Sequence, residues 1–339
     1  MFSTRIVRAA VVQTCTAAYS LPDTLDKLEY YAKDASQKGA QLAVFPEALY
    51  VIDCPDYLGL GFISSFYISI GGYPKMSTFG AVVGARSAEG REEFLRYHSS
   101  AIEIPSPAIT TIEFISKDLN IFLVVGIIEK DGGTLYCTAI FIDPVEGFVA
   151  KHRKLMPTAM ERIIWGMGDG STLPVLEKTF QSGDQKQKVT TKISATICWE
   201  NYMPLCKAST CNLRTQIYCV PTVDARPVWQ HTMRHIALEG RCFVLSACQF
   251  SKEKDYPSDH SVVDPNNRNS ENVMIAGGSV IVNPLGEVLA GPLLDREGVL
   301  VADLDLNDVV RGQFDLDIVG HYARSDIFQL HTNVAAPPV

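Results

Sequence analysis

The chain has 339 residues, of which 47% are hydrophobic and 20% are charged, and its formal net charge is −8. This apolar fraction can bury a sizeable core and argues against a disordered chain. The acidic balance, with a pI of about 5.4, disfavours nucleic acid or an anionic membrane as the main partner, so a small neutral substrate fits better.

Nine cysteines at irregular spacing and an N-terminus without a charged-apolar-small leader predict a reducing, cytoplasmic setting without disulfides. The triplet Cys206, Cys211 and Cys219 has no C-x-x-C pair and no histidine at ligand spacing, which argues against zinc. No apolar run approaches ~18 residues, so no transmembrane helix is expected. Because nothing resembles a linker, we predict one domain over residues 1–331 and a flexible tail at 332–339.

The first elements alternate between strand and helix. An apolar run at 6–13 predicts a strand, and it precedes an amphipathic helix that Asp23 can cap and that Gly39 ends. The apolar run at 42–45 predicts a buried strand. Glu47 follows it directly, where a carboxylate suits the active site of an open α/β sheet; a surface or helix-start carboxylate is the alternative.

Residues 50–70 are rich in aromatic and aliphatic side chains but are interrupted by Pro55, Gly59 and Gly61. They match neither helix nor strand periodicity, so we predict an apolar loop. Exposed apolar surface is costly in water, which predicts that the loop is buried at a pocket rim or in a subunit contact. A segment foreign to a working enzyme, which would leave the protein poorly folded, is a third possibility.

The middle of the chain predicts helices followed by an antiparallel pair of strands. The expected elements are helices at 89–97 and 107–117, strands at 122–128 and 135–142 around the turn at 131–133, and a short strand at 148–151. The strand-helix-strand rhythm of the N-terminal part therefore ends here.

A basic cluster leaves the last of these strands. A solvated sheet edge is sufficient to explain Lys151 and Arg153. Lys154 alternates to the face of Ala150 and His152, so it can point inward, where a buried ammonium needs carboxylates around it.

A second carboxylate, Glu161, follows on a predicted helical turn at 159–165. The glycine-rich run at 166–171 comes next. It lacks the lysine and Ser/Thr of a P-loop, which disfavours phosphate binding.

Cys198 lies at the end of an alternating run. Val189, Ile193 and Ile197 alternate with polar or small residues, as in a half-buried strand. Asn201 can cap a following helix, which would set Cys198 on a strand-to-helix turn where converging N–H groups favour a thiolate. A nucleophile suits such a turn, and a buried structural cysteine is the alternative.

The rest of the chain predicts further strands and helices around one long loop. The expected strands are at 216–220, 243–247, 279–282 and 299–303, and the expected helices at 227–240 and 306–314. The polar segment 251–271 predicts a long surface loop.

Five motifs occur in a fixed order along the chain. They are Phe45-Pro46-Glu47-Ala48, Lys151 to Thr158, Glu161-Arg162 with Trp165 to Ser171, Ile197 to Asn201, and Gly320 to Arg324. Together they resemble the nitrilase branch of the carbon-nitrogen hydrolase superfamily, and plant and fungal nitrilases most. The resemblance extends from about residue 6 to residue 331.

This resemblance implies an α/β fold, the α-β-β-α sandwich of the nitrilase superfamily, in which two sheets lie between helical layers. It implies a catalytic group made of Glu47, Lys154 and Cys198, with Glu161 as a second carboxylate nearby. Contacts with the substrate are predicted for Tyr73, Trp199, Thr158 and Pro221.

The implied reaction explains these residue types. A nitrile carbon is a weak electrophile and needs a soft, strong nucleophile such as a thiolate. Glu47 would pass the thiol proton to the nitrile nitrogen, giving a thioimidate on Cys198. Lys154 and the backbone N–H of Trp199 would stabilise charge in the intermediates. Two waters then release ammonia and a carboxylic acid, and no metal or organic cofactor is required.

We therefore predict a nitrilase that acts on a small organic nitrile and forms a homo-oligomer larger than a dimer, with a spiral or filament included. Nitrile or cyanide hydratase activity that stops at the amide is one alternative. A non-catalytic homo-oligomeric scaffold of the same fold is another. The natural nitrile does not follow from the sequence.

Three segments depart from the pattern of the nitrilases that the chain resembles. The motif Gly71-Gly72-Tyr73-Pro74 lies far from Glu47 along the sequence, so residues 50–70 look like an insertion beside the pocket. Segment 180–192 is longer and more polar than the usual hairpin before the cysteine strand. Segment 205–214 lacks the smooth apolar period expected of the helix after Cys198.

Overall fold

The computed structural model describes residues 5–17, 20–48, 81–82, 85–182, 187–255 and 269–336. The predicted apolar insertion at 50–70 and Tyr73 lie outside these residues, as do the last residues of the predicted tail.

The first sheet has six strands and joins the two ends of the chain. Its strands, in spatial order, are β15 (Gly298–Asp305), β1 (Ile6–Gln13), β2 (Leu42–Val44), β5 (Phe122–Asp131), β6 (Thr134–Asp143) and β7 (Gly147–Arg153). The neighbours β1, β2 and β5 are parallel, whereas β5, β6 and β7 form an antiparallel meander. The predicted change from strand-helix-strand units to a hairpin is confirmed.

The second sheet has seven strands and carries the candidate nucleophile. Its main path is β12 (Phe250–Lys252), β13 (Val273–Val282), β11 (Phe243–Cys248), β10 (Ile217–Thr222), β9 (Lys188–Ala195) and β8 (Val175–Gln181), and β14 (Val288–Leu294) pairs with β13. Strands β9, β10 and β11 are parallel. A separate short hairpin joins β3 (Ala81–Val82) to β4 (Ala85–Arg86).

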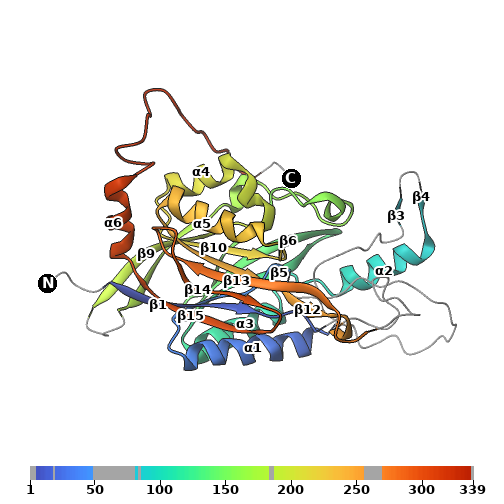
Figure 1. The fold of residues 1–339 in the computed structure, drawn as a ribbon. Helices are drawn as coiled ribbons and strands as arrows, with labels where there is room; N and C mark the ends of the chain where they lie inside the picture. The colour runs from blue at the N-terminus through green and yellow to red at the C-terminus, as the bar shows by residue number, and fades with distance from the viewer. Residues whose placement is uncertain are drawn as a thin grey trace.

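Helices cover the outer faces of both sheets, as Figure 1 shows. The helices are α1 (Leu21–Gln37), α2 (Ala88–Ser99), α3 (Pro107–Leu119), α4 (Pro204–Asn212), α5 (Val228–Gly240) and α6 (Asn307–Asp315). Helices α1 and α3 pack on the first sheet, and α5 packs on the second. Short 3-10 helices in the described part of the chain are η1 (Ala159–Ile163), η2 (Gly170–Thr172), η3 (Cys198–Tyr202) and η4 (Glu253–Asp255).

The alternation of side chains along the strands explains the layers. In β1, Val7 and Val11 face the core between the two sheets, whereas Val12 faces α1 and α3. In β10, Cys219 faces the same inner core, and Tyr218 packs against α5. Because each sheet is apolar on both faces, it must be covered on both, and the α-β-β-α sandwich follows.

Two predicted helix caps are wrong. The hydroxyl of Ser20, and not Asp23, caps α1, since it accepts the Asp23 N–H at 3.3 Å. Pro22 has no N–H to donate, and such a residue suits the first turn of a helix, where N–H groups have no partner within the helix. The helix therefore begins before Pro22. Asn201 does not cap α4, which begins with a proline; its amide donates to the Cys198 carbonyl at 2.8 Å and fastens η3.

The loop predicted at 251–271 is also wrong at its beginning. Ser251 and Glu253 are buried, because the chain pairs with β13 as the short strand β12 and then forms η4. Two of the three segments that depart from the nitrilase pattern, 180–192 and 205–214, nevertheless contain regular structure in their described parts. Strands β8 and β9 pair as a hairpin, and a helix, α4, follows Cys198.

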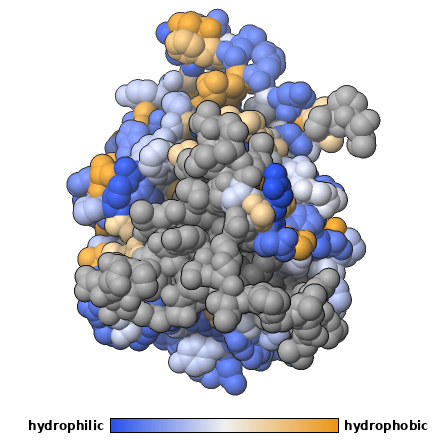
Figure 2. Space-filling view, turned by 90° about the vertical axis from the view of Figure 1, so that its right-hand side faces the viewer, coloured by the Kyte–Doolittle hydropathy of each residue, from blue (hydrophilic) through white to orange (hydrophobic). Residues whose placement is uncertain are grey.

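No helix in the described ranges is long and apolar enough to cross a bilayer. On the face shown in Figure 2, the described residues are mainly hydrophilic, and hydrophobic ones occur in small groups among them.

Candidate active site

Cys198 stands just beyond the end of β9, as the first residue of η3. Its φ is +50°, a left-handed conformation that is rare for a residue with a side chain. Such strain persists only where the surroundings enforce it, and it is concentrated at functional sites. The side chain is only 3% exposed. The predicted strand-to-helix turn at Cys198 is confirmed, with the 3-10 helix η3 directly after the strand.

Glu47 lies just past the central strand β2 and is fully buried. Its backbone passes so close to β5 that a Cβ on Gly126 would lie 2.2 Å from the Pro46 carbonyl oxygen. The Gln249 amide donates to the Glu47 carbonyl at 2.7 Å from the second sheet. A glycine in one sheet and an amide in the other thus hold this turn in place.

Lys154 follows β7 and points inward, as predicted. Its fully buried ammonium contacts Glu47 Oε1 at 2.7 Å and Glu161 Oε2 at 2.8 Å. Glu161 is itself fixed, because its Oε2 accepts the Thr158 N–H at 2.6 Å. The structure therefore brings Glu47, Lys154 and Glu161 into contact from three separate segments, and Cys198 lies close enough for their charges to act on its pKa.

Burial and charge determine the protonation of this group. Burial alone would lower the pKa of Lys154, but the charges around it, that of Glu47 first, raise this pKa well above its ordinary value. Burial raises the pKa of Glu47, and the Lys154 ammonium offsets this effect only in part. Lys154 is therefore an ammonium at neutral pH, and Glu47 has a greater affinity for a proton than an exposed glutamate.

The expectation of a favoured thiolate is wrong for the resting site. Burial, and next the charge of Glu47, raise the pKa of Cys198, and the Lys154 ammonium does not compensate. Cys198 is therefore a protonated thiol at neutral pH. Glu47 Oε2 is buried without a hydrogen-bond partner at normal distance among the described residues, and the Cys198 thiol lies near enough to this carboxyl to lower its pKa.

The sequence analysis missed a thiol next to this base. The Sγ of Cys137, in β6, donates to Glu47 Oε1 at 3.5 Å. Burial, and then the charge of Glu47, raise the pKa of Cys137 well above its ordinary value. Cys137 therefore stays a neutral donor that orients the carboxylate.

The most important omission is a second buried ion pair, between Glu200 and His152. Glu200 Oε1 accepts the Leu155 N–H at 2.7 Å, and Oε2 accepts the Ile197 N–H at 2.6 Å. These two N–H groups are the neighbours of Lys154 and Cys198 in the chain. One carboxylate thus fixes the backbone beside both residues.

His152 is the positively charged partner of the Glu200 carboxylate. Its Nε2 lies 2.9 Å from Glu200 Oε2, and its Nδ1 lies 2.6 Å from the Thr172 carbonyl oxygen. Burial alone would lower the pKa of His152, but Glu200 raises it; burial would raise the pKa of Glu200, but His152 lowers it. With an acceptor at each nitrogen, His152 is a buried imidazolium. The sequence signals for this pair were the alternation of His152 with Lys154 and the positions of His152 and Glu200 within the motifs 151–158 and 197–201.

A cavity of about 200 Å³ opens at Cys198. It is lined by Thr158, Glu161, Cys198, Trp199, Val223, Asp224 and Arg226. Two predicted substrate contacts, Thr158 and Trp199, therefore lie at the cavity. Pro221 does not line it, because it is buried inside β10, and Tyr73 lies outside the described residues.

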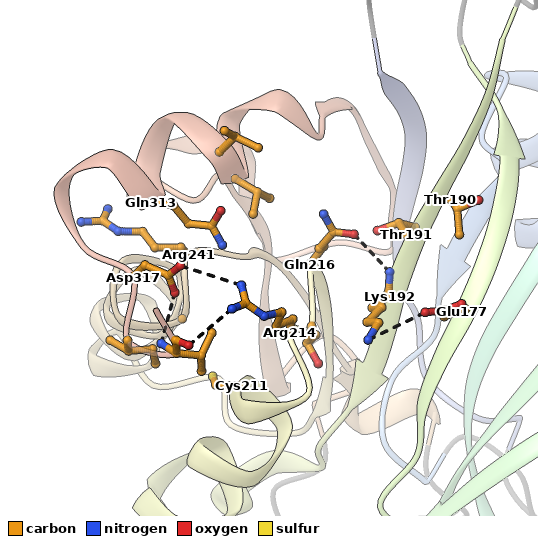
Figure 3. A pocket seen from close by; sticks show the side chains of 16 residues that line it. Glu177, Thr190, Thr191, Lys192, Cys211, Arg214, Gln216, Arg241, Gln313 and Asp317 are labelled. Carbon is orange, nitrogen blue, oxygen red and sulfur yellow. Dashed lines mark hydrogen bonds and ion pairs between the residues drawn. The ribbon is translucent and has the colours of Figure 1, made fainter. Parts of the chain in front are cut away.

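A larger hollow of about 290 Å³ lies elsewhere, between β9, α6 and the segment after α6 (Figure 3). Lys192 in its wall lies 3.7 Å from Glu177, and Arg214 lies 3.8 Å from Asp317. Its part of β9 is about six residues before Cys198, or roughly 20 Å along a strand. The hollow is therefore separate from the group around Cys198.

The sequence matches the Carbon-nitrogen hydrolase family over residues 8–312. The chain belongs to this family. An arylacetonitrilase from Trametes versicolor (strain FP-101664) is 65% identical to it, over 95% of this chain and 95% of its own length. A bifunctional nitrilase/nitrile hydratase from Nicotiana tabacum is 47% identical, over 97% of this chain and 86% of its own.

Among solved structures, an amidase from a Nesterenkonia species superimposes with a TM-score of 0.59 at 19% identity, over 93% of this chain and 97% of that one. This likeness concerns the fold and confirms the superfamily architecture. The fungal and plant relatives confirm the predicted nitrilase branch.

Replacing Gly126 by alanine should lower kcat by about 100-fold, because the new Cβ must push the Glu47 turn away from Lys154. Gly133→Ala is the matched control, since a Cβ there meets nothing within 4 Å. Steady-state kinetics with thermal unfolding separates misplacement from misfolding. A Gly126→Ala enzyme with normal kcat would contradict the role of this close approach.

Glu200→Gln should destabilise the protein by about 3–5 kcal/mol, because His152 loses its buried counter-charge. Because the pKa of His152 is raised in the folded protein, its contribution to the free energy of unfolding is complete below about pH 6.5 and is lost as the pH rises through this raised pKa. Because the pKa of Glu200 is lowered in the folded protein, its contribution to the free energy of unfolding is complete above about pH 4.3 and is lost as the pH falls through this lowered pKa. Denaturant unfolding should therefore show the largest difference from wild type between these limits; a pH-independent difference would contradict the ion pair.

Proposed function

We propose that this nitrilase hydrolyses arylacetonitriles to the corresponding carboxylic acid and ammonia. The observation that carries the proposal is the Lys154 ammonium, held by Glu47 and Glu161 beside a buried thiol that opens on a cavity. The substrate class is supported by the 65% identical arylacetonitrilase and by the indole of Trp199, which gives the cavity an aromatic wall.

Glu47 accepts the Cys198 proton as sulfur attacks the nitrile carbon, and it then delivers this proton to nitrogen. The product of this step is a thioimidate, R–C(=NH)–S. The raised pKa of Glu47 suits both halves of the transfer, because the group must take and release the same proton. Lys154 stays charged throughout and stabilises the negative charge that develops.

Water then adds to the thioimidate carbon, and Glu47 moves both of its protons to nitrogen, which gives the tetrahedral intermediate R–C(O⁻)(NH₃⁺)–S. The carbon–nitrogen bond of the tetrahedral intermediate breaks, ammonia leaves with the electron pair, and a thioester remains. A second water, again deprotonated by Glu47, releases the acid and returns the thiol. The backbone N–H of Trp199 is proposed to bind the oxyanion at these steps.

The second candidate is amide formation at the same site. The Nicotiana tabacum relative is named as both nitrilase and nitrile hydratase. Acid and amide measured together on aromatic, arylaliphatic and aliphatic nitriles test the two activities. No ammonia, acid or amide from any nitrile would overturn the proposal and favour the non-catalytic scaffold.

The setting and the assembly belong to the same proposal. None of the eight cysteines in the described ranges forms a disulfide, which supports a reducing, cytoplasmic compartment. Pairing of β1 with β15 supports a single domain over 1–331.

Leu205 of α4 is 70% exposed, and Val228 of α5 and Leu213 are about half exposed, which supports a subunit contact on this layer.

Cys198→Ala should abolish turnover and leave the fold intact, and Cys198→Ser should be nearly as inactive, because an alcohol is a far weaker nucleophile than a thiolate. An active-site electrophile should add once to the wild-type protein, as intact mass shows, and not to either variant. Modification mainly at Cys206 or Cys211 would identify the wrong nucleophile.

Glu47→Gln should lower kcat by about 1,000-fold, because it removes the proton carrier. Glu161→Gln should lose roughly ten times less, since it weakens only the placement of Lys154. The two amide variants are matched controls for each other. Equal losses in single-turnover kinetics would show that the two roles are wrongly divided.

Leu205→Glu should shift the protein to smaller particles in light scattering, because a charge cannot be buried in an apolar contact without a partner. Phe114→Glu is the control, since Phe114 is 58% exposed on α3, in the opposite layer. A wild-type protein that is a uniform 37.3 kDa monomer would refute the assembly.

A further inference from the structure

The Thr222 hydroxyl lies against the reacting sulfur. Thr222 is the last residue of β10 and is fully buried, and its Oγ1 is 3.3 Å from the Cys198 Sγ. The same oxygen accepts the Asp224 N–H at 3.0 Å. An N–H can only donate, so the hydroxyl proton is free for sulfur. Thr222 is therefore a donor directed at the nucleophile.

This direction is enforced by the neighbouring loop. The Asp224 carboxylate accepts the Trp199 indole N–H at 2.9 Å and the Arg226 Nε–H at 2.8 Å. The Arg226 guanidinium also stands 5.0 Å from the Trp199 ring centre. Because Asp224 is anchored on both sides, its backbone N–H is fixed, and so is the hydroxyl that accepts from it.

We propose that Thr222 is a catalytic residue that stabilises Cys198 sulfur as an anion and thereby raises the proportion of amide product. This inference rests on the nitrilase activity proposed above. A hydrogen bond to an anion is stronger than one to a neutral sulfur, so the contact gains strength only when sulfur carries charge. It therefore acts in the transition states in which the carbon–sulfur bond forms or breaks.

Two exits compete in the tetrahedral intermediate R–C(O⁻)(NH₃⁺)–S. If the carbon–nitrogen bond breaks, nitrogen takes the electron pair, ammonia leaves and the thioester goes on to acid. If the carbon–sulfur bond breaks, sulfur takes the pair as thiolate, the carbonyl forms, and the extra proton on nitrogen passes to Glu47, leaving the amide. Thr222 contacts sulfur and not nitrogen, so it lowers the barrier of the second exit alone.

The test compares Thr222→Val, which removes the hydroxyl, with Thr222→Ser, which retains it. With phenylacetonitrile, the valine variant should lose roughly 10- to 100-fold in kcat/KM, and its amide-to-acid ratio should fall roughly tenfold. The serine variant should keep both values within about threefold. Thr191→Val is the matched control, because Thr191 is buried in β9 and its hydroxyl has no hydrogen-bond partner among the described residues.

If Thr222 served only in packing, Thr222→Val would change the stability and kcat/KM but not the amide-to-acid ratio. Thr222→Ser would then also lose stability and kcat/KM. An unchanged ratio in Thr222→Val, or no amide from the wild-type enzyme, would overturn the inference while leaving the nitrilase activity standing. If no nitrile is turned over, the proposed function fails instead. Iodoacetamide then still tests Thr222, since alkylation of Cys198 at fixed pH should slow about tenfold in the valine variant and not in the serine variant.

If Thr222→Val does not fold, Thr222→Ala provides the hydroxyl deletion with less volume to accommodate. The alanine variant should show the same fall in ratio and in alkylation rate. Wild-type values for both measurements in a folded Thr222→Ala protein would overturn the inference.

Discussion

The buried ammonium of Lys154 is the constraint on which the rest of this site depends. A charge without solvent is tolerated only when opposite charges surround it, and here Glu47 and Glu161 supply them. This requirement ties the end of β2, the end of β7 and η1 to one point. The close approach of Gly126 to the Glu47 turn is one consequence, because any side chain at this position would separate the carboxylate from the ammonium.

A second buried pair sets the distance between the two halves of the site. Glu200 binds the N–H groups next to Lys154 and next to Cys198, and His152 neutralises it. The first sheet thus holds the cation and the second holds the sulfur, with one carboxylate between them. The left-handed Cys198 backbone is held by this carboxylate and by Asn201, which binds the Cys198 carbonyl.

Burial favours the protonated forms of both Cys198 and Glu47. The pKa of Cys198 is raised, so the sulfur is a thiol, and the pKa of Glu47 is raised, so this base can carry a proton. Reactivity then depends on groups that act only on a developing charge. In the proposed mechanism, Lys154 acts on the carboxylate and the oxyanion, whereas Thr222 acts on the sulfur, which is one of the two possible leaving groups.

The sequence by itself determined the family and the strands of the first sheet, and it singled out Glu47, Lys154, Glu161 and Cys198 as candidates, whereas β8, β12 and β14 of the second sheet were not predicted. Their motifs are local, and the alternation that turns Lys154 inward is a property of one strand. Only the tertiary structure decided how these groups are held. Gln249, Gly126 and Thr222 come from distant strands, and no local pattern marks a glycine or a hydroxyl that matters because another segment approaches it. The tertiary structure also decided the protonation of Cys198, because its pKa follows from burial and from the charge of Glu47, which is 151 positions earlier in the chain.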